Sequence, residues 1–470
     1  MDTRTFDSSS RDIGTPLVQY GSTSDRTAGD ALRGDRAPVA VLVCHGMGQQ
    51  TRYETISLIA ESIRTQASDA GGTPEPVEVH LSYENGSFLA RAEVNWSDDV
   101  KIKRSVHVYE AYWAPLTEGR VTYWDTVLFL LSASWNGLKY SKLFRPSTFE
   151  RWMFDGKKTM LIGRATFAAI VFVLLFLAAQ VGVIGYVLTT LAQQYNDIVS
   201  HPLPLIGASG FLWACFKWLS PLLPGIERLF HPDNFGREWW HTLGYLLLWN
   251  FLIAEAFFVR YFIIQYVGDV AAYISPYKDS KFDEIRRQIQ NVGLGFGKTI
   301  YGFGSPAATV PHYRRIVVVG HSLGSVLAYD TLNALINLDN VSTPENRRDV
   351  IGRTRALITF GSPLDKTAFI FRMQARTDQE WIREQLAASV QPLIVSYDDY
   401  RPGSFDWVNI WSKMDIISGE LNYYDDPARA FNAAPCVQNK PDPDARTPLK
   451  AHVEYWNNRL LRQELYRFVT

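Results

Sequence analysis

Cysteine is scarce in this chain of 470 residues, which contains only Cys44, Cys215 and Cys436. Three cysteines so widely spaced are too few for a disulfide framework or a cysteine-based zinc site, and they favour a reducing compartment. The chain also lacks an excess of either charge, because 47 lysines and arginines oppose 48 aspartates and glutamates, for a formal net charge of −1. Nucleic-acid binding would need a basic surface, so we expect no nucleic-acid partner.

The first 36 residues lack an apolar run of the length that a signal peptide needs. They are rich in serine, threonine, aspartate and arginine, a composition that favours disorder. We therefore expect a disordered tail over residues 1–36. Order should begin at Ala37, where APVAVLVCHGMG opens with a buried strand over Val39–Cys44.

Charged residues are absent from Ala165 to Ala192, a run that is long enough to cross a bilayer as a helix. Two further apolar stretches follow. The stretch 203–223 contains two prolines and a lysine, which favours a re-entrant or interfacial helix. The stretch 242–266 is long enough to span the bilayer, but its carboxylate at Glu255 should face protein or water.

Strands are expected on both sides of this apolar block, so the chain should cross the bilayer an even number of times. We expect two crossings, with the soluble domain in the cytoplasm, because basic residues flank both ends of the block. These residues are Lys139, Lys142, Arg145, Arg151, Lys157, Lys158 and Arg164 before it, and Lys278, Lys281, Arg286 and Arg287 after it. Two alternatives are a four-crossing arrangement that uses residues 122–138 and a monotopic hairpin in one leaflet.

Outside the apolar block, short apolar strands alternate with amphipathic helices, which predicts an α/β domain with a mostly parallel sheet. A hairpin is expected to turn at Glu84-Asn85-Gly86. The expected organisation is a disordered tail (1–36), the first part of the α/β domain (37–120), a membrane-associated helical insertion (121–267) and the second part of the domain (268–470).

The pentapeptide Gly320-His321-Ser322-Leu323-Gly324 follows the apolar strand RRIVVVG and precedes a helical pattern. This strand–turn–helix context is the one in which a G-x-S-x-G serine acts as a nucleophile, because the tight turn projects the hydroxyl at the edge of the sheet. Gly320 and Gly324 are expected to remove side chains that would clash in this turn. Ser322 is thus the candidate nucleophile.

A serine nucleophile needs a base, and the base needs an orienting acid. With the chain order serine, acid, histidine, His452 is the only histidine beyond a plausible acid. Asp415 follows the expected strand Trp407–Trp411 and is the preferred acid. Asp365 is the main rival, and the weaker candidates are Asp406 and Glu420.

Two backbone N–H groups are needed to bind the developing oxyanion. Leu323, directly after the serine, should supply one of them. Met47 should supply the other, from the turn His45-Gly46-Met47-Gly48 after the first strand, where His45 and Gly46 support the turn.

Taken together, the GHSLG turn, the HGMG turn, FGSP after the next strand, Asp415 and His452 make the chain resemble an alpha/beta-hydrolase of the lipase/esterase type. The resemblance covers roughly residues 37–115 and 268–470. It implies the alpha/beta-hydrolase fold and serine esterase, lipase or thioesterase chemistry with neither cofactor nor metal. The insertion at 120–267 departs from the family, which has only a crossover helix there.

The leading interpretation is a membrane-anchored serine hydrolase that cleaves acyl esters of lipids through a Ser-His-Asp triad, with the bilayer as its substrate source. One alternative is a thioesterase that removes acyl chains from membrane proteins. Another is a non-catalytic membrane scaffold that retains the hydrolase fold. The membrane is the expected partner, and a homo-oligomer is compatible with the sequence.

Overall fold

The structure of the chain is a computed structural model. It describes residues 18–20, 37–47, 51–84, 87–98, 102–118, 120–122, 125–126, 128–129, 148–150, 159–161, 268–274, 280–303, 313–367, 393, 405–415, 417–424, 437–447 and 450–470. The chain divides into two compact units. The first comprises residues 1–120, 149–160 and 272–470, and the second comprises 121–148 and 161–271.

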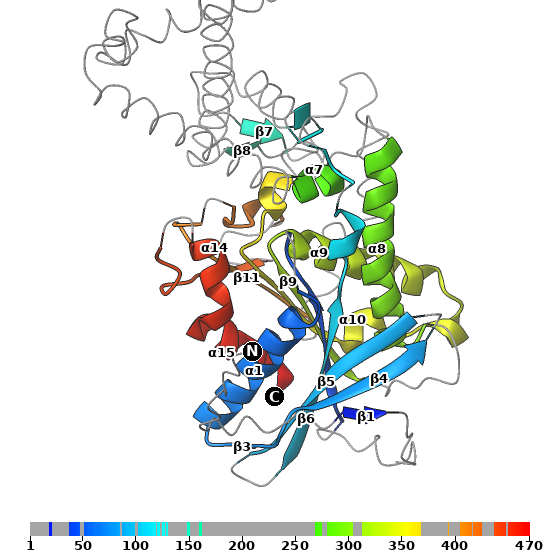
Figure 1. The fold of residues 1–470 in the computed structure, drawn as a ribbon, viewed down its shortest axis with the longest axis vertical. Coiled ribbons are helices and arrows are strands. Elements are labelled where there is room, and N and C mark those ends of the chain that lie inside the picture. Colours follow the sequence, from blue (N-terminus) through cyan, green and yellow to red (C-terminus); the bar gives the residue numbers. More distant parts are fainter. Residues whose placement is uncertain are drawn as a thin grey trace, which may run out of the picture. The chain divides into compact units, whose positions relative to one another are not determined.

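A single mixed sheet forms the centre of the first unit (Figure 1), with the strand order β1-β4-β5-β6-β2-β9-β10-β11-β12 and with β3 paired to β5. The strands are β1 (Val18–Tyr20), β2 (Val39–Cys44), β3 (Thr73–Pro74), β4 (Glu78–Glu84), β5 (Ser87–Ser97), β6 (Lys103–Ala111), β9 (Arg315–His321), β10 (Thr354–Phe360), β11 (Asp406–Trp411) and β12 (Val437–Pro441). Parallel pairing runs without a break from β6 through β2 to β12, whereas β4, β5 and β6 pair antiparallel. The predicted α/β class with a mostly parallel sheet is therefore confirmed.

Helices cover both faces of the central strands, as parallel sheets require. On one face, side chains of α1 (Glu54–Asp69) and α15 (Arg459–Val469) form one hydrophobic core with Val41 and other strand residues. The helix α9 (Leu323–Val341) packs on β9 and β2, and α8 (Ser280–Tyr301) packs on α9. Gly293 and Gly297 permit this close approach, since a Cβ atom at either position would overlap a side chain of α9.

Shorter elements complete the described structure. They are α7 (Gly268–Ile274), α10 (Val350–Arg353), α14 (Ala451–Glu454), the 3₁₀ turns Ala114–Leu116, Pro344–Asn346, Asn422–Tyr424 and Tyr455–Asn457, and a separate two-stranded sheet of β7 (Thr148–Glu150) and β8 (Thr159–Leu161). The predicted hairpin is present, because β4 and β5 pair from Glu84 and Ser87 outward. Val18–Tyr20, within the predicted disordered tail, instead form β1 beside β4, so this triplet departs from the prediction.

The expected membrane segments 165–192, 203–223 and 242–266 lie outside the described residues. Within the described ranges, no helix combines the length and apolar character needed to cross a bilayer. The number of membrane crossings thus stays a prediction from sequence.

Candidate functional site

Ser322 occupies a sharp turn between β9 and α9. Its backbone has φ 52° and ψ −130°, a conformation that a non-glycine residue adopts only when its surroundings enforce it. The N–H of Ser322 donates to the carbonyl oxygen of Phe360 on the neighbouring strand at 3.0 Å, and Ser325 Oγ donates to the carbonyl oxygen of Gly320 at 2.8 Å. These bonds hold the turn in place while Leu323 begins the helix.

Glycine is required at Gly320 and at Gly324 for two different steric reasons. A Cβ atom on Gly320 would lie 2.5 Å from the Cα of Ser325, inside the following helix. A Cβ atom on Gly324 would overlap the carbonyl oxygens of Cys44 and His45 at the end of β2. The expected clearance is therefore present, and at Gly324 it serves the packing of α9 against the neighbouring strand.

His452 lies in the short helix α14 and brings its ring to the serine. Its Nε2 is 2.8 Å from Ser322 Oγ, and its Nδ1 is 2.9 Å from Asp415 Oδ2. Because a carboxylate only accepts hydrogen bonds, Nδ1 carries the proton and Nε2 accepts from the serine hydroxyl. Ser322 and Asp415, which are separated from His452 by 130 and 37 positions in the sequence, are thereby joined in one hydrogen-bonded chain.

Asp415 lies beyond the end of β11, with its side chain only 1% exposed. Burial raises the pKa of its carboxyl, but the hydrogen bond and charge of His452, together with bonds from Ile417 N–H and Ser418, bring the net pKa well below its usual range. The group is therefore a carboxylate at neutral pH. It can hold the histidine tautomer and stabilise a positive charge on the ring.

A further hydroxyl donates to the same carboxylate. Tyr455 OH lies 3.0 Å from Asp415 Oδ2 and 3.0 Å from Ser418 Oγ. Burial and the charge of Asp415 raise the pKa of Tyr455, so the phenol remains a donor. Lys366 Nζ donates to the carbonyl oxygens of Ile417 and Ser418 at 2.8 and 3.0 Å, which fixes the loop that follows the aspartate.

His321, the residue before the serine, also contacts His452, the candidate base. Its Nε2–H donates to the backbone carbonyl oxygen of His452 at 2.9 Å, and its ring packs against those of Phe360, His452 and Trp456. Burial lowers the pKa of His321 to about 3, and the neighbouring His452 contributes to this shift, so the His321 ring is neutral. Gly361, at φ 58°, leaves room for both rings, since a Cβ atom there would lie 3.2 Å from His452 Cε1.

The turn after β2 lies against the serine. A Cβ atom on Gly46 would be 2.9 Å from Ser322 Cβ and 3.0 Å from His321 Nδ1, so only glycine allows this approach. His45 supports the turn, because its Nδ1 donates to Gly46 O at 2.7 Å and its Nε2 accepts the backbone N–H of Trp113 at 3.0 Å. Burial lowers the pKa of His45 to about 4, which keeps it neutral in this role.

The two predicted oxyanion donors lie on the two segments that meet at Ser322. Leu323 is the first residue of α9, where the helical N–H groups have no partner inside the helix. Met47 directly follows Gly46 and is buried. The Gly48 part of the predicted turn lies outside the described residues.

Among the candidate acids, only Asp415 shares a described hydrogen bond with His452. Asp406 is at the start of β11, the opposite end from Asp415, where its carboxylate accepts from Gln438 at 2.7 Å. Glu420 accepts from Asn422 at 3.0 Å. Asp365 lies in a short helical segment, residues 364–367, that follows β10, beside Lys366.

Two features differ from the sequence-based expectation. Ser322 is only 1% exposed, whereas the sequence predicts a projecting hydroxyl. Tyr455 and Lys366 were not anticipated. Tyr455 could have been found from its spacing, since it follows His452 by three residues on a helical segment and so shares its face.

A scan against protein-family models, a search of curated proteins and a search of solved structures each found no match to the chain.

Proposed function

We propose that this chain is a serine hydrolase of the alpha/beta-hydrolase type that cleaves acyl esters. The observation that supports this most strongly is the unbroken hydrogen-bonded chain from Ser322 Oγ through both ring nitrogens of His452 to Asp415. A serine in a strained strand–turn–helix junction, a base within 2.8 Å and a buried carboxylate behind it are the parts that nucleophilic acyl transfer needs.

In the proposed reaction, Ser322 Oγ attacks the carbonyl carbon of the ester while His452 Nε2 accepts the hydroxyl proton. Asp415 stabilises the imidazolium that results. Collapse of the tetrahedral intermediate breaks the bond to the alcohol, which leaves with the proton from His452. Water then attacks the acyl-serine with the same histidine as base, and the free acid and the hydroxyl of Ser322 are regenerated.

The tetrahedral oxyanion is proposed to bind the N–H groups of Leu323 and Met47. Support comes from the position of Gly46, whose backbone lies against Ser322 and brings the next residue to the same place. An amide of this kind contributes roughly 3 kcal/mol to stabilisation of the transition state in other enzymes.

The proposed substrate class is an acyl ester of a lipid, and the proposed location is a cytoplasmic domain anchored to a membrane. Both rest on the sequence, in which no charged residue interrupts 165–192. An enzyme held at a bilayer meets acyl chains that are scarce in water. Alkaline carbonate extraction of membranes from expressing cells should leave the full chain in the pellet, and its release into the supernatant would reject the insertion.

The catalytic part is tested with Ser322→Ala and the matched control Ser57→Ala, which changes an exposed serine on α1. Ser322→Ala should lower hydrolysis of short p-nitrophenyl esters by at least about 10⁴-fold, and Ser57→Ala should retain the parental rate. A fluorophosphonate probe should label the parent and Ser57→Ala but not Ser322→Ala. Absence of both hydrolysis and labelling in the parent would favour the scaffold alternative, and a preference for thioesters would favour the thioesterase.

A further inference from the structure

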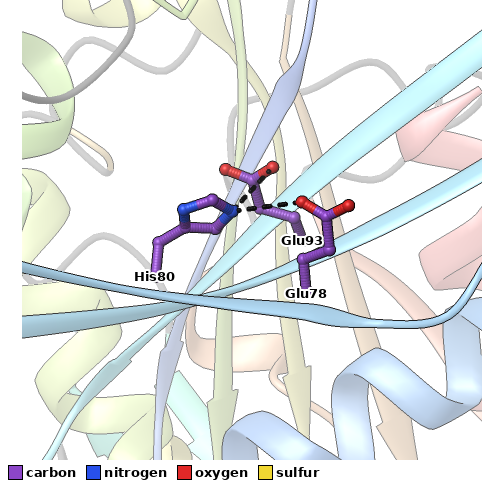
Figure 2. A group of neighbouring side chains, drawn as sticks. All are labelled: Glu78, His80 and Glu93. Atoms are coloured by element: carbon purple, nitrogen blue, oxygen red, sulfur yellow. Dashed lines mark ion pairs between the residues drawn. The ribbon is translucent and has the colours of Figure 1, made fainter. Parts of the chain in front are cut away.

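The hairpin of β4 and β5 carries a second polar cluster, formed by Glu78, His80 and Glu93 (Figure 2). Glu78 lies directly opposite Glu93 in the antiparallel register. His80 is two residues beyond Glu78, so its side chain leaves the strand on the same face. Two carboxylates that face each other across a strand pair repel, and this arrangement calls for a cation between them.

The imidazole of His80 is turned toward both carboxylates (Figure 2). Its Nε2 lies 3.4 Å from Glu78 Oε2 and 3.4 Å from Glu93 Oε2. Neither approach has the geometry of a hydrogen bond, and this nitrogen is a buried polar atom with no hydrogen-bond partner among the described residues. A buried polar atom left without a partner costs about 1–3 kcal/mol, which a metal bond at this nitrogen would offset.

These separations match the spacing of ligands around zinc. With Zn–N and Zn–O bonds of about 2.0–2.2 Å and tetrahedral angles, two ligand atoms lie about 3.4 Å apart. One ligand atom from each residue lies within 4.8 Å of the other two. The Glu78 side chain, which is 44% exposed, has the freedom to close the remaining distance.

Glu93 is held as a ligating carboxylate typically is, by hydrogen bonds on its other oxygen. Arg91 donates to Glu93 Oε1 from Nε at 2.7 Å and forms an ion pair with it, since Nη2 lies 2.6 Å from that oxygen. His107 Nε2 lies 3.5 Å from the same oxygen. These contacts leave Oε2 directed at His80. His107 is in turn fixed by Tyr313, whose hydroxyl lies 2.6 Å from His107 Nδ1.

We propose that Glu78, His80 and Glu93 bind a divalent transition-metal ion of the zinc class, with water as the fourth ligand. The imidazole distinguishes zinc from magnesium, because magnesium prefers an all-oxygen shell. Bound metal would join the two strands of the hairpin. The proposal is independent of the hydrolase function.

The test is isothermal titration of the full-length, metal-stripped protein with Zn²⁺ and, separately, with Mg²⁺. The parent is compared with His80→Gln, Glu78→Gln and the control Glu75→Gln. Glu75 matches Glu78 in its 44% side-chain exposure but pairs with Lys103 at 3.4 Å. His80→Gln and Glu78→Gln should each weaken zinc binding at one site by at least about tenfold, while Glu75→Gln should bind as the parent does.

Cobalt gives a second measurement, since tetrahedral Co²⁺ absorbs in the visible and this band should be lost in His80→Gln. Circular dichroism establishes whether each variant is folded. If His80→Gln does not fold, Glu78→Gln, at a half-exposed position, tests the metal site instead. Unchanged zinc stoichiometry and affinity in Glu78→Gln would overturn the proposal. So would equal weak binding of zinc and magnesium by the parent, the result expected if His80 is simply an imidazolium between two carboxylates.

Discussion

The two polar clusters of the sheet are assembled in opposite ways. Ser322, Asp415 and His452 come from three distant segments and meet beyond the ends of parallel strands. Glu78, His80 and Glu93 come from one hairpin and meet on the face of antiparallel strands. The first depends on the whole sheet being correctly formed, whereas the second needs only the register of a single turn.

This difference determines how sensitive the geometry of each cluster is to changes in packing. Parallel strands end at a common edge, so loops far apart in sequence converge there, and any error in packing separates them. A hairpin keeps its partners close even when the rest of the sheet is perturbed. We therefore expect changes at the Ser322 cluster to have large effects on rate and stability, and changes at the hairpin cluster to have small effects on stability.

The largest effect is expected for the acid. Asp415→Asn should lower kcat for ester hydrolysis by about 10⁴-fold, because an amide cannot hold the tautomer of His452 in which Nδ1 is protonated. The matched control is Asp365→Asn, which should change kcat by less than about threefold. Steady-state kinetics on a p-nitrophenyl ester decides between them, and the reverse ranking would assign the acid to Asp365.

Packing at the junction is the next test. Gly324→Ala should destabilise the fold by about 3 kcal/mol or more, because its methyl group would overlap two backbone carbonyls that cannot move aside. Gly295→Ala is the control, since a Cβ atom there meets nothing within 4 Å. It should stabilise α8 by up to about 1 kcal/mol. Urea denaturation measures both, and similar stabilities would contradict the close packing of α9 on β2.

The buried histidines make the fold sensitive to acid. The native pKa of His45, about 4, lies below that of an unfolded histidine, about 6.5, so the unfolded chain binds the proton first. The stability from neutral His45 is complete above about pH 6.5 and declines by up to about 3 kcal/mol as the pH falls toward 4. Urea unfolding across this range should show the decline, and His45→Gln should make it smaller, leaving the part that comes from neutral His321. A free energy of unfolding independent of pH would contradict this burial.

A smaller effect is expected at Tyr455, and it tests whether this residue positions the carboxylate of Asp415 or only stabilises the fold. Tyr455→Phe removes one hydrogen bond to Asp415 and should lower kcat about tenfold with KM unchanged. Tyr466→Phe on α15 is the control, because that ring packs on Trp96 away from the carboxylate. An equal loss in both variants, or a rise in KM alone, would remove Tyr455 from the positioning of the acid.

The smallest effect is expected at the hairpin. In metal-free buffer, Glu78→Gln should change the free energy of unfolding by less than about 1 kcal/mol, because partly exposed ion pairs contribute little. Thermal unfolding of the parent and the variant measures this difference. A loss comparable to that of Gly324→Ala would show that the hairpin cluster stabilises the fold as much as the central junction does.

Much of the sheet could be predicted because its central strands are buried on both faces. Every residue of Val39–Cys44 is buried, and such strands appear in the sequence as short unbroken apolar runs. The expected alternation of strands with amphipathic helices is also present, as in α1 (Glu54–Asp69) after β2. By contrast, the sequence does not indicate β12 (VQNKP), because its residues are largely polar and, among the described strands, it pairs with β11 alone.

The candidate site was partly predictable because strand ends bring motifs together at one edge. Ser322 and Asp415 each follow a strand that the sequence indicates, and His452 is indicated by chain order alone. The contacts of Lys366 depend on how the segments after β10 and β11 approach each other, which no local pattern encodes. Tyr455, by contrast, follows His452 at a spacing that places both on one helical face. The Glu78–His80–Glu93 group was accessible in principle. The sequence predicts a hairpin there, and the register in which Glu84 pairs with Ser87 also pairs Glu78 with Glu93.

The near-complete burial of Ser322 has a kinetic consequence. An acylating reagent cannot reach a serine that is 1% exposed until the groups that enclose it move aside. Covalent modification should therefore proceed through a first-order isomerisation, and its observed rate should reach a plateau as reagent concentration rises. The height of that plateau would measure how often the enclosure opens, independently of the chemistry that follows.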